Sequence, residues 1–126
     1  MRPQSNTLTG QELEIMRVIW PRERATVREV YESLRESRSI AYTSVQTMMN
    51  VLVKKGHLVR TPGDRAHVYV PAQAQEQVVG SMVREFVQRV FDGSARPLLV
   101  HLAGTKGLTA KDRRALQQLL DAEEEK

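Results

Sequence analysis

The spacing of apolar residues changes at Gly56, and this change restricts the possible folds more than any other feature of the chain. Before Gly56, apolar residues recur every three or four positions, as on the buried face of an α-helix. After it, the segments HLVRT and AHVYV flank the turn sequence PGDR, a pattern typical of two short strands in a hairpin. The sequence therefore predicts helices first and a small β-hairpin after them.

Three helices are predicted before the hairpin, because a threonine precedes a glutamate or glutamine by three positions at three places. These capping boxes are TGQE (9–12), TVRE (26–29) and TSVQ (43–46). Pro21 is expected to end the first helix. The third helix is expected to span 43–55, with Gly56 in the left-handed conformation that follows many helices.

Three helices followed by a hairpin is the order of elements in a winged helix-turn-helix domain, which we assign to residues 1–72. In that fold the third helix, here 43–55, enters the major groove of DNA, and the hairpin at 58–70 becomes the wing. Residues 73–126 predict only further helices: one over 74–91, a short one begun by Pro97 and a last one capped by Thr109. The predicted fold class is mainly α with a small β-hairpin.

The excess of positive charge is confined to one part of the chain. The whole sequence has 19 basic and 15 acidic residues, a net charge of +4. Residues 1–37 and 68–126 are each balanced, so the entire excess lies in 38–67, the segment that holds the third helix and the wing. A local positive excess is the electrostatic signature of a polyanionic partner such as DNA.

The exposed face of the third helix is polar, yet it contains no acid. Exposed helix faces usually mix Glu and Lys, which are good helix formers. Short Thr, Ser, Gln and Asn side chains exchange hydrogen bonds with base edges, and basic residues beside them contact phosphates. The candidate DNA-binding residues are Tyr42, Thr43, Ser44, Gln46, Thr47, Asn50, Lys54, Lys55 and Arg65. For Thr43 and Gln46, capping of the helix start is an equal alternative.

The C-terminal segment is too short to enclose its own apolar surface, because about 50 residues bury little area. Its first helix is apolar around nearly half of its circumference. A second copy of the chain would cover this surface, and a two-fold axis would also place two recognition helices on successive major grooves. We therefore predict that 73–126 is a helical dimerisation domain. The candidate dimerisation residues are Val79, Met82, Val83, Phe86, Val90, Leu98, Leu102, Leu116, Leu119 and Leu120.

Other classes of function find little support in the sequence. The chain has no cysteine, its three histidines are scattered, and it contains no hydrolase, zinc-protease or phosphate-loop motif. We therefore predict no catalytic residue, metal site, cofactor or small-molecule substrate. The N-terminal residues lack the apolar core of a signal peptide, so a cytoplasmic location is expected. The alternative is a helical protein-interaction module without sequence-specific DNA binding, which would explain the apolar helices but not the confined charge.

The sequence also contains the stretches LTGQELEIMRVIWPRERATVREVYESL, AYTSVQTMMNVLVKKGHLVR and DRAHVYVP. These three stretches resemble the penicillinase repressor family, often called BlaI/MecI/CopY. The resemblance implies a winged-helix repressor that binds a palindromic operator in double-stranded DNA as a homodimer. It also implies relief of repression by cleavage in the C-terminal domain, triggered by a membrane-embedded metallopeptidase sensor.

The chain departs from the family pattern at three places. The copper-responsive branch has a cysteine motif near its C-terminus, and this chain has no cysteine. Cleavable members are cut at an Asn-Phe bond, and the matching bond here is His101–Leu102, which we take as the candidate cleavage bond. The last turn of the recognition helix often carries Arg where this chain has Val51, which predicts a different operator sequence.

Overall fold

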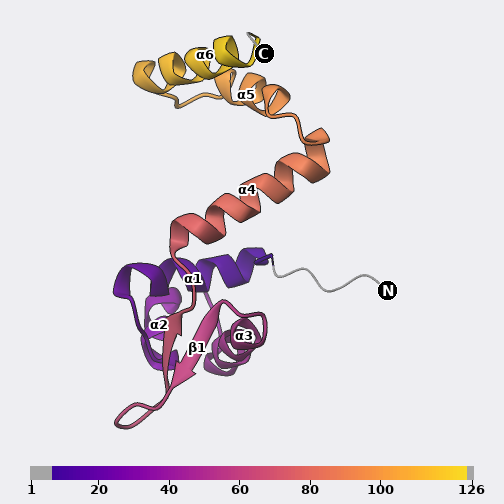
Figure 1. Cartoon of the computed structure of the whole chain (residues 1–126). Helices are drawn as coiled ribbons and strands as arrows, with labels where there is room; N and C mark the ends of the chain where they lie inside the picture. The colour runs from indigo at the N-terminus through magenta and orange to yellow at the C-terminus, as the bar shows by residue number, and fades with distance from the viewer. Residues whose placement is uncertain (1–6, 125–126) are drawn as a thin grey trace. The chain divides into compact units, whose positions relative to one another are not determined.

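The computed structural model describes residues 7–124 and divides the chain into two compact units, 1–79 and 80–126. The first six and last two residues, which the sequence analysis included in its two domains, lie outside the described residues. The elements are α1 (Gly10–Arg22), α2 (Val27–Arg35), α3 (Tyr42–Lys54), β1 (Leu58–Thr61), β2 (Val68–Pro71), α4 (Gln75–Phe91), α5 (Arg96–Ala103) and α6 (Ala110–Glu124) (Figure 1).

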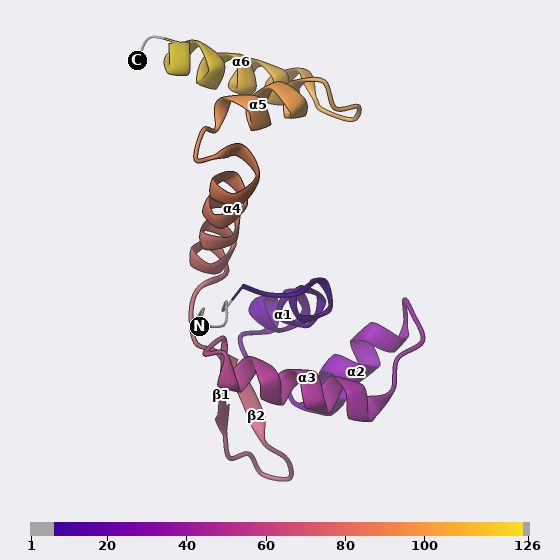
Figure 2. The same cartoon turned by 90° about the vertical axis from the view of Figure 1, so that its right-hand side faces the viewer.

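The first unit is a winged helix-turn-helix fold, as the order of elements predicted. β1 and β2 pair antiparallel, with Leu58 opposite Pro71 and Thr61 opposite Val68. Their turn projects beyond the helices as a wing (Figures 1 and 2). The fold class, mainly α with a small hairpin, is confirmed.

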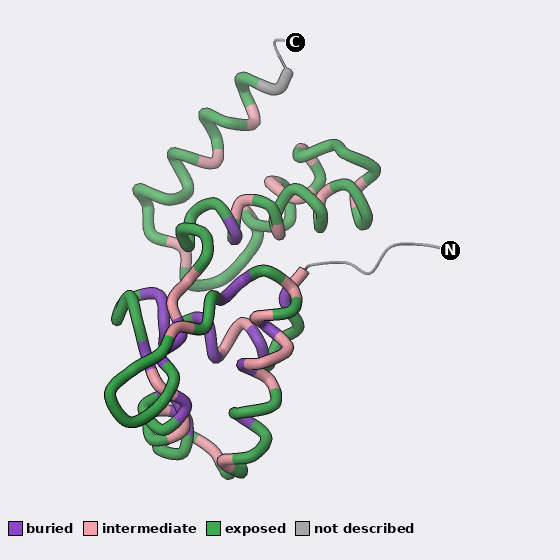
Figure 3. Tube along the Cα trace, turned by 60° about the horizontal axis from the view of Figure 1, so that its bottom comes forward, coloured by how far each residue is buried: buried purple, intermediate pink, exposed green. Residues whose placement is uncertain are grey.

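The core of the first unit lies among α1, α2, α3 and the hairpin. Each helix contributes the apolar side chains that its 3.6-residue period places on one face. The largest fully buried side chains are Ile15, Met16, Ile19, Val30, Val45, Met49, Leu52 and Leu58. Figure 3 shows buried stretches concentrated in this unit, whereas α5 and α6 are coloured as half-buried or exposed. The core thus fixes the orientation of α3, whose opposite face is left open.

Two of the three predicted capping boxes are present. The Thr9 hydroxyl accepts a hydrogen bond from the Glu12 N–H at 3.2 Å, and the Glu12 carboxylate accepts one from the Thr9 N–H at 2.9 Å. Thr26 and Glu29 repeat this pattern at the start of α2. The third box is wrong: α3 begins at Tyr42, one residue before Thr43, and its N-cap Ala41 has no side-chain cap.

The end of α1 also differs from the prediction. Pro21 lies inside the helix, which continues to Arg22 and ends at Glu23 in the left-handed conformation, with φ of 68°. The Glu23 N–H donates to the Ile19 and Trp20 carbonyls, so the helix closes with satisfied backbone groups after the proline. Gly56, with φ of 86°, has the left-handed conformation that was predicted.

The boundary between the units lies seven residues beyond the predicted one at 72/73. The reason is that the first turn of α4 belongs to the winged-helix unit, where Val78 is buried. In the second unit, α5 and α6 lie side by side (Figures 1 and 2). They are joined by hydrogen bonds from Arg96 to the Leu120 carbonyl and from Arg113 to the Ala103 carbonyl. Among the described residues, none of the helices is long and apolar enough to cross a membrane.

Candidate nucleic-acid interface

The open face of α3 carries most of the predicted DNA-binding side chains. Because Val45, Met49 and Leu52 are fully buried, the opposite face of the helix points away from the core. Exposed there are Thr43, Ser44, Gln46, Thr47 and Lys54, while Tyr42 and Asn50 are half-buried. Of the two remaining candidates, Arg65 is exposed in the wing turn, whereas Lys55 is half-buried against Glu12 of α1. Apart from Lys55, the structure thus brings these residues to one side of the winged-helix unit.

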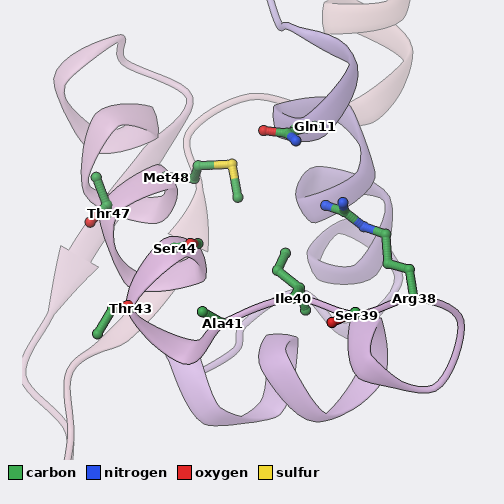
Figure 4. A pocket seen from close by; sticks show the side chains of 9 residues that line it. All are labelled: Gln11, Arg38, Ser39, Ile40, Ala41, Thr43, Ser44, Thr47 and Met48. Carbon is green, nitrogen blue, oxygen red and sulfur yellow. The ribbon is translucent and has the colours of Figure 1, made fainter.

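A hollow of about 610 Å³, which we call the α1 hollow, lies along one side of this face (Figure 4). Thr43, Ser44 and Thr47 line it from α3. The connection from α2 to α3 closes it below, and Gln11 of α1 lies opposite. No acid lines it, and its one charged lining residue, Arg38, forms an ion pair with Glu14 of α1 at 3.2 Å.

A second hollow of about 650 Å³, the wing hollow, lies between α3, the start of α2 and the hairpin. Its lining residues from α3 are Tyr42, Gln46 and Asn50. Arginines enter it from three elements: Arg28 from α2, Arg60 from β1 and Arg65 from the wing turn; no acid lines it. The polar face of α3 therefore forms a ridge between two acid-free hollows, each with at least one arginine.

Asn50 connects this ridge to the wing. Its side-chain oxygen accepts hydrogen bonds from the Tyr69 hydroxyl at 3.0 Å and from the Arg60 guanidinium at 3.3 Å. Tyr69 is itself buried, and its backbone exchanges two hydrogen bonds with Ala25 in the α1–α2 connection. The hairpin is thereby attached to α3 through a side chain and to the α1–α2 connection through its backbone.

Tyr42 is held by neighbours on α2. Its ring meets the Tyr31 ring edge to face, with centroids 5.5 Å apart. The Arg28 guanidinium lies 5.3 Å from the Tyr42 ring centroid, a cation–π contact. These contacts fix the first turn of α3 beside the wing hollow, whereas a DNA contact by Tyr42 stays a prediction.

Lys55 requires a correction. Its ammonium lies 2.7 Å from the Glu12 carboxylate and 3.4 Å from the Thr7 carbonyl, so its charge is neutralised inside the winged-helix unit. Burial opposes ionisation of Glu12, but the hydrogen bond from Lys55, the bond from the Thr9 N–H and the attraction of the ammonium outweigh it. Together they hold the pKa of Glu12 below its usual value. Lys55 therefore ties α3 to α1 and is removed from the candidate DNA contacts.

Three arginines in the two hollows were absent from the predicted set: Arg28, Arg38 and Arg60. Arg28 was missed because residues 1–37 have no net charge. The helix-turn-helix order itself could have indicated it, since the helix before the recognition helix crosses the DNA backbone. For Arg38 and Arg60 the signal was their membership of the positively charged segment.

The candidate dimerisation residues lie on α4, α5 and α6. Val79, Val83, Phe86 and Val90 are 38–50% exposed, at successive spacings of four, three and four along α4. Leu102 and Leu119 are also exposed, whereas Met82, Leu98, Leu116 and Leu120 are half-buried. The candidate cleavage bond His101–Leu102 is in the last turn of α5, and both of its residues are exposed.

Comparison with known proteins decides the family. The family model described as penicillinase repressor matches residues 8–122. The chain belongs to the penicillinase repressor family. It is 38% identical to the transcriptional regulator BlaI of Mycobacterium tuberculosis, over 86% of this chain and 81% of that protein. It is 25% identical to the penicillinase repressor of Bacillus licheniformis, over 90% of this chain and 89% of that protein.

One solved structure of a family member is also similar. It is the solution structure of the monomeric form of Bacillus licheniformis BlaI in complex with the blaP half-operator. The similarity covers 59% of this chain and 87% of that chain, with 32% identity and a TM-score of 0.49. The relatives named above are a transcriptional regulator and a repressor. In this chain, the described residues contain no group of side chains that could hold a metal ion.

Proposed function

We propose that this protein is a transcriptional repressor that binds a palindromic operator in double-stranded DNA as a homodimer. The observation that carries the proposal is the acid-free ridge of α3 between two arginine-bearing hollows. In the bound state the ridge enters the major groove, where short polar side chains reach base edges. The arginines of the wing hollow, Arg28, Arg60 and Arg65, then face the sugar–phosphate backbone that borders the groove on that side.

The test is selection from a randomised library of double-stranded DNA, followed by mobility-shift titration with random competitor DNA. Thr47→Glu places a negative charge on the ridge and is expected to abolish retention of the selected DNA. Gln118→Glu, an equal charge change at an exposed position on α6, is the matched control and should bind normally. If Thr47→Glu binds as well as the control, α3 does not face DNA. A wild-type chain that retains no DNA would favour the protein-interaction module.

Dimerisation is proposed to use the exposed apolar stripe of α4. The spacings of four, three and four among Val79, Val83, Phe86 and Val90 are those of a helix seam that packs against a second helix. Because each of these side chains is only 38–50% exposed, covering the rest of it contributes about half of the 1.5–3 kcal/mol of full burial, and the four together still favour association. Of the eight large apolar side chains exposed among the described residues, seven lie on α4–α6, which supports an interface in the C-terminal part.

Relief of repression is proposed to occur by cleavage at His101–Leu102, triggered by a membrane-embedded metallopeptidase sensor. What supports this bond is its position in the family pattern and in a short, eight-residue helix without a side-chain N-cap. Such short helices depend on packing and unwind locally, as a protease requires. Intact mass spectrometry of the repressor co-expressed with a sensor peptidase tests it. One fragment that ends at His101 and one that begins at Leu102 are expected. Fragments with other ends would show that another bond is cleaved.

A further inference from the structure

The two hydrogen bonds on the Asn50 amide oxygen determine which part of that side chain is available to DNA. Arginine has donors and no acceptor, so the Arg60 guanidinium at 3.3 Å requires the oxygen, and not the NH₂ group, to face it. The Tyr69 hydroxyl donates to the same oxygen at 3.0 Å. With two donors on it, this oxygen is occupied.

The amide nitrogen of Asn50 is in the opposite situation. No described residue accepts a hydrogen bond from it, and Asn50 lines the wing hollow between α3 and the hairpin. Asn50 lies on the same side of α3 as Gln46, one turn further along the helix, so the two side chains face the same hollow. Asn50 is therefore equipped to donate hydrogen bonds into this hollow but not to accept them.

We infer that Asn50 is a donor-only specificity residue, which selects a base with an acceptor at the major-groove edge. The inference rests on the proposed function, since it requires α3 to lie in the major groove. Guanine offers N7 and O6 as acceptors, thymine offers O4 and adenine offers N7 beside its N6 donor, whereas cytosine presents only the N4 donor. Adenine is paired by asparagine through both amide groups, and that pairing needs the oxygen that Tyr69 and Arg60 occupy.

Tyr69 is thus a positioning residue for base recognition, although it is buried and does not touch DNA itself. Its backbone hydrogen bonds to Ala25 at 2.8 and 3.0 Å hold the ring in place, so the hydroxyl stays on Asn50 when the helix enters the groove. A guanine or thymine is expected at the position that Asn50 contacts, favoured over cytosine on the order of ten-fold. Adenine, which can accept from Asn50 only at N7, should have no advantage over guanine or thymine there.

Selection from a randomised DNA library with the full chain tests this inference. Asn50→Ala first identifies the position that Asn50 reads, as the one where base preference is lost. Tyr69→Phe and the double variant Tyr69→Phe/Arg60→Met then free the oxygen. They are expected to gain a preference for adenine at that same position, on the order of ten-fold. If Tyr69→Phe folds poorly, Arg60→Met alone still tests the inference, because it removes one donor from the oxygen at an exposed position.

Tyr31→Phe is the matched control, because it deletes a phenolic hydroxyl on α2 that is not bonded to Asn50. It should leave the preference at the Asn50 position unchanged. A wild-type preference for adenine at that position would overturn the inference, as would unchanged preferences in the double variant or in Asn50→Ala. These results leave the proposed function intact. If the wild-type chain enriches no sequence at all, the proposed function fails and the inference fails with it.

Discussion

Replacement of Lys55 by methionine is expected to destabilise the winged-helix unit by about 2–3 kcal/mol at pH 7. Removal of one partner of a buried ion pair costs about 3–5 kcal/mol, because the other charge is left uncompensated. The cost expected here is smaller than that, because the Lys55 side chain is still 23% exposed and Glu12 keeps its hydrogen bond from the Thr9 N–H. The matched control is Lys54→Met at the adjacent exposed position, which should cost less than about 0.5 kcal/mol.

The cost of Lys55→Met should depend on pH. In the wild-type fold the pKa of Glu12 lies below its unfolded value of about 4.3. The ion pair therefore stabilises fully above about pH 4.3, and this stabilisation is lost as pH falls through the folded pKa. In the variant, burial remains while the two contributions from Lys55 disappear, so the pKa of Glu12 rises. The difference between wild type and variant should accordingly shrink when urea denaturation is moved from pH 7 to acidic pH.

Two results would refute this reasoning. One is equal stability of Lys55→Met and Lys54→Met at pH 7, which would mean that the ion pair contributes nothing. The other is a stability difference that does not shrink at acidic pH, which would mean that the lost stability comes from packing of the Lys55 side chain and not from its charge. If Lys55→Met kept its stability but weakened DNA binding more than Lys54→Met, the original assignment of Lys55 to phosphate would be restored.

Three further measurements test the DNA-binding surface and the interface. Thr47→Ala is expected to weaken binding to selected DNA by about 1–3 kcal/mol and leave random DNA unaffected in competition mobility shifts, and equal losses would show that it reads no base. Arg65→Ala should reduce the slope of log K against log salt by about 0.9 per contact, or about 1.8 per dimer, and an unchanged slope would mean no phosphate contact. Val83→Glu with Val90→Glu should convert the proposed dimer to monomer in sedimentation, and a dimer that persists would mean that the interface lies elsewhere.

The elements of the fold could be predicted where local chemistry decides the structure. Thr9 and Thr26 form their capping boxes because each pairs with a glutamate three residues on, which satisfies both backbone donors. The same spacing at Thr43 forms no capping box, since α3 starts one residue earlier, at Tyr42, whose ring packs against Tyr31. Pro21 was expected to end α1, but the helix continues for one more residue, to Arg22.

The candidate site was predictable in its main element but not in its details. The acid-free face of α3 was visible in the sequence, and the structure exposes it. Lys54 and Lys55 are indistinguishable by sequence, since only the position of Glu12 on α1 decides that one is exposed and the other paired. The role of Asn50 was likewise hidden, because its partners Arg60 and Tyr69 come from the two strands of the hairpin.

The mutual hydrogen bonds of Ala25 and Tyr69 have a consequence for changes in chain length. They fix the inner strand of the hairpin, so an inserted residue on either side of Ala25 would shift the partner of Tyr69 by one position. The turn at 62–67 lies outside this attachment and is exposed throughout. Whole turns of other lengths can therefore be exchanged there while strand register and helix packing persist. The tip of the wing is the part of this repressor best suited to grafting, and the α1–α2 connection is the part least able to accept it.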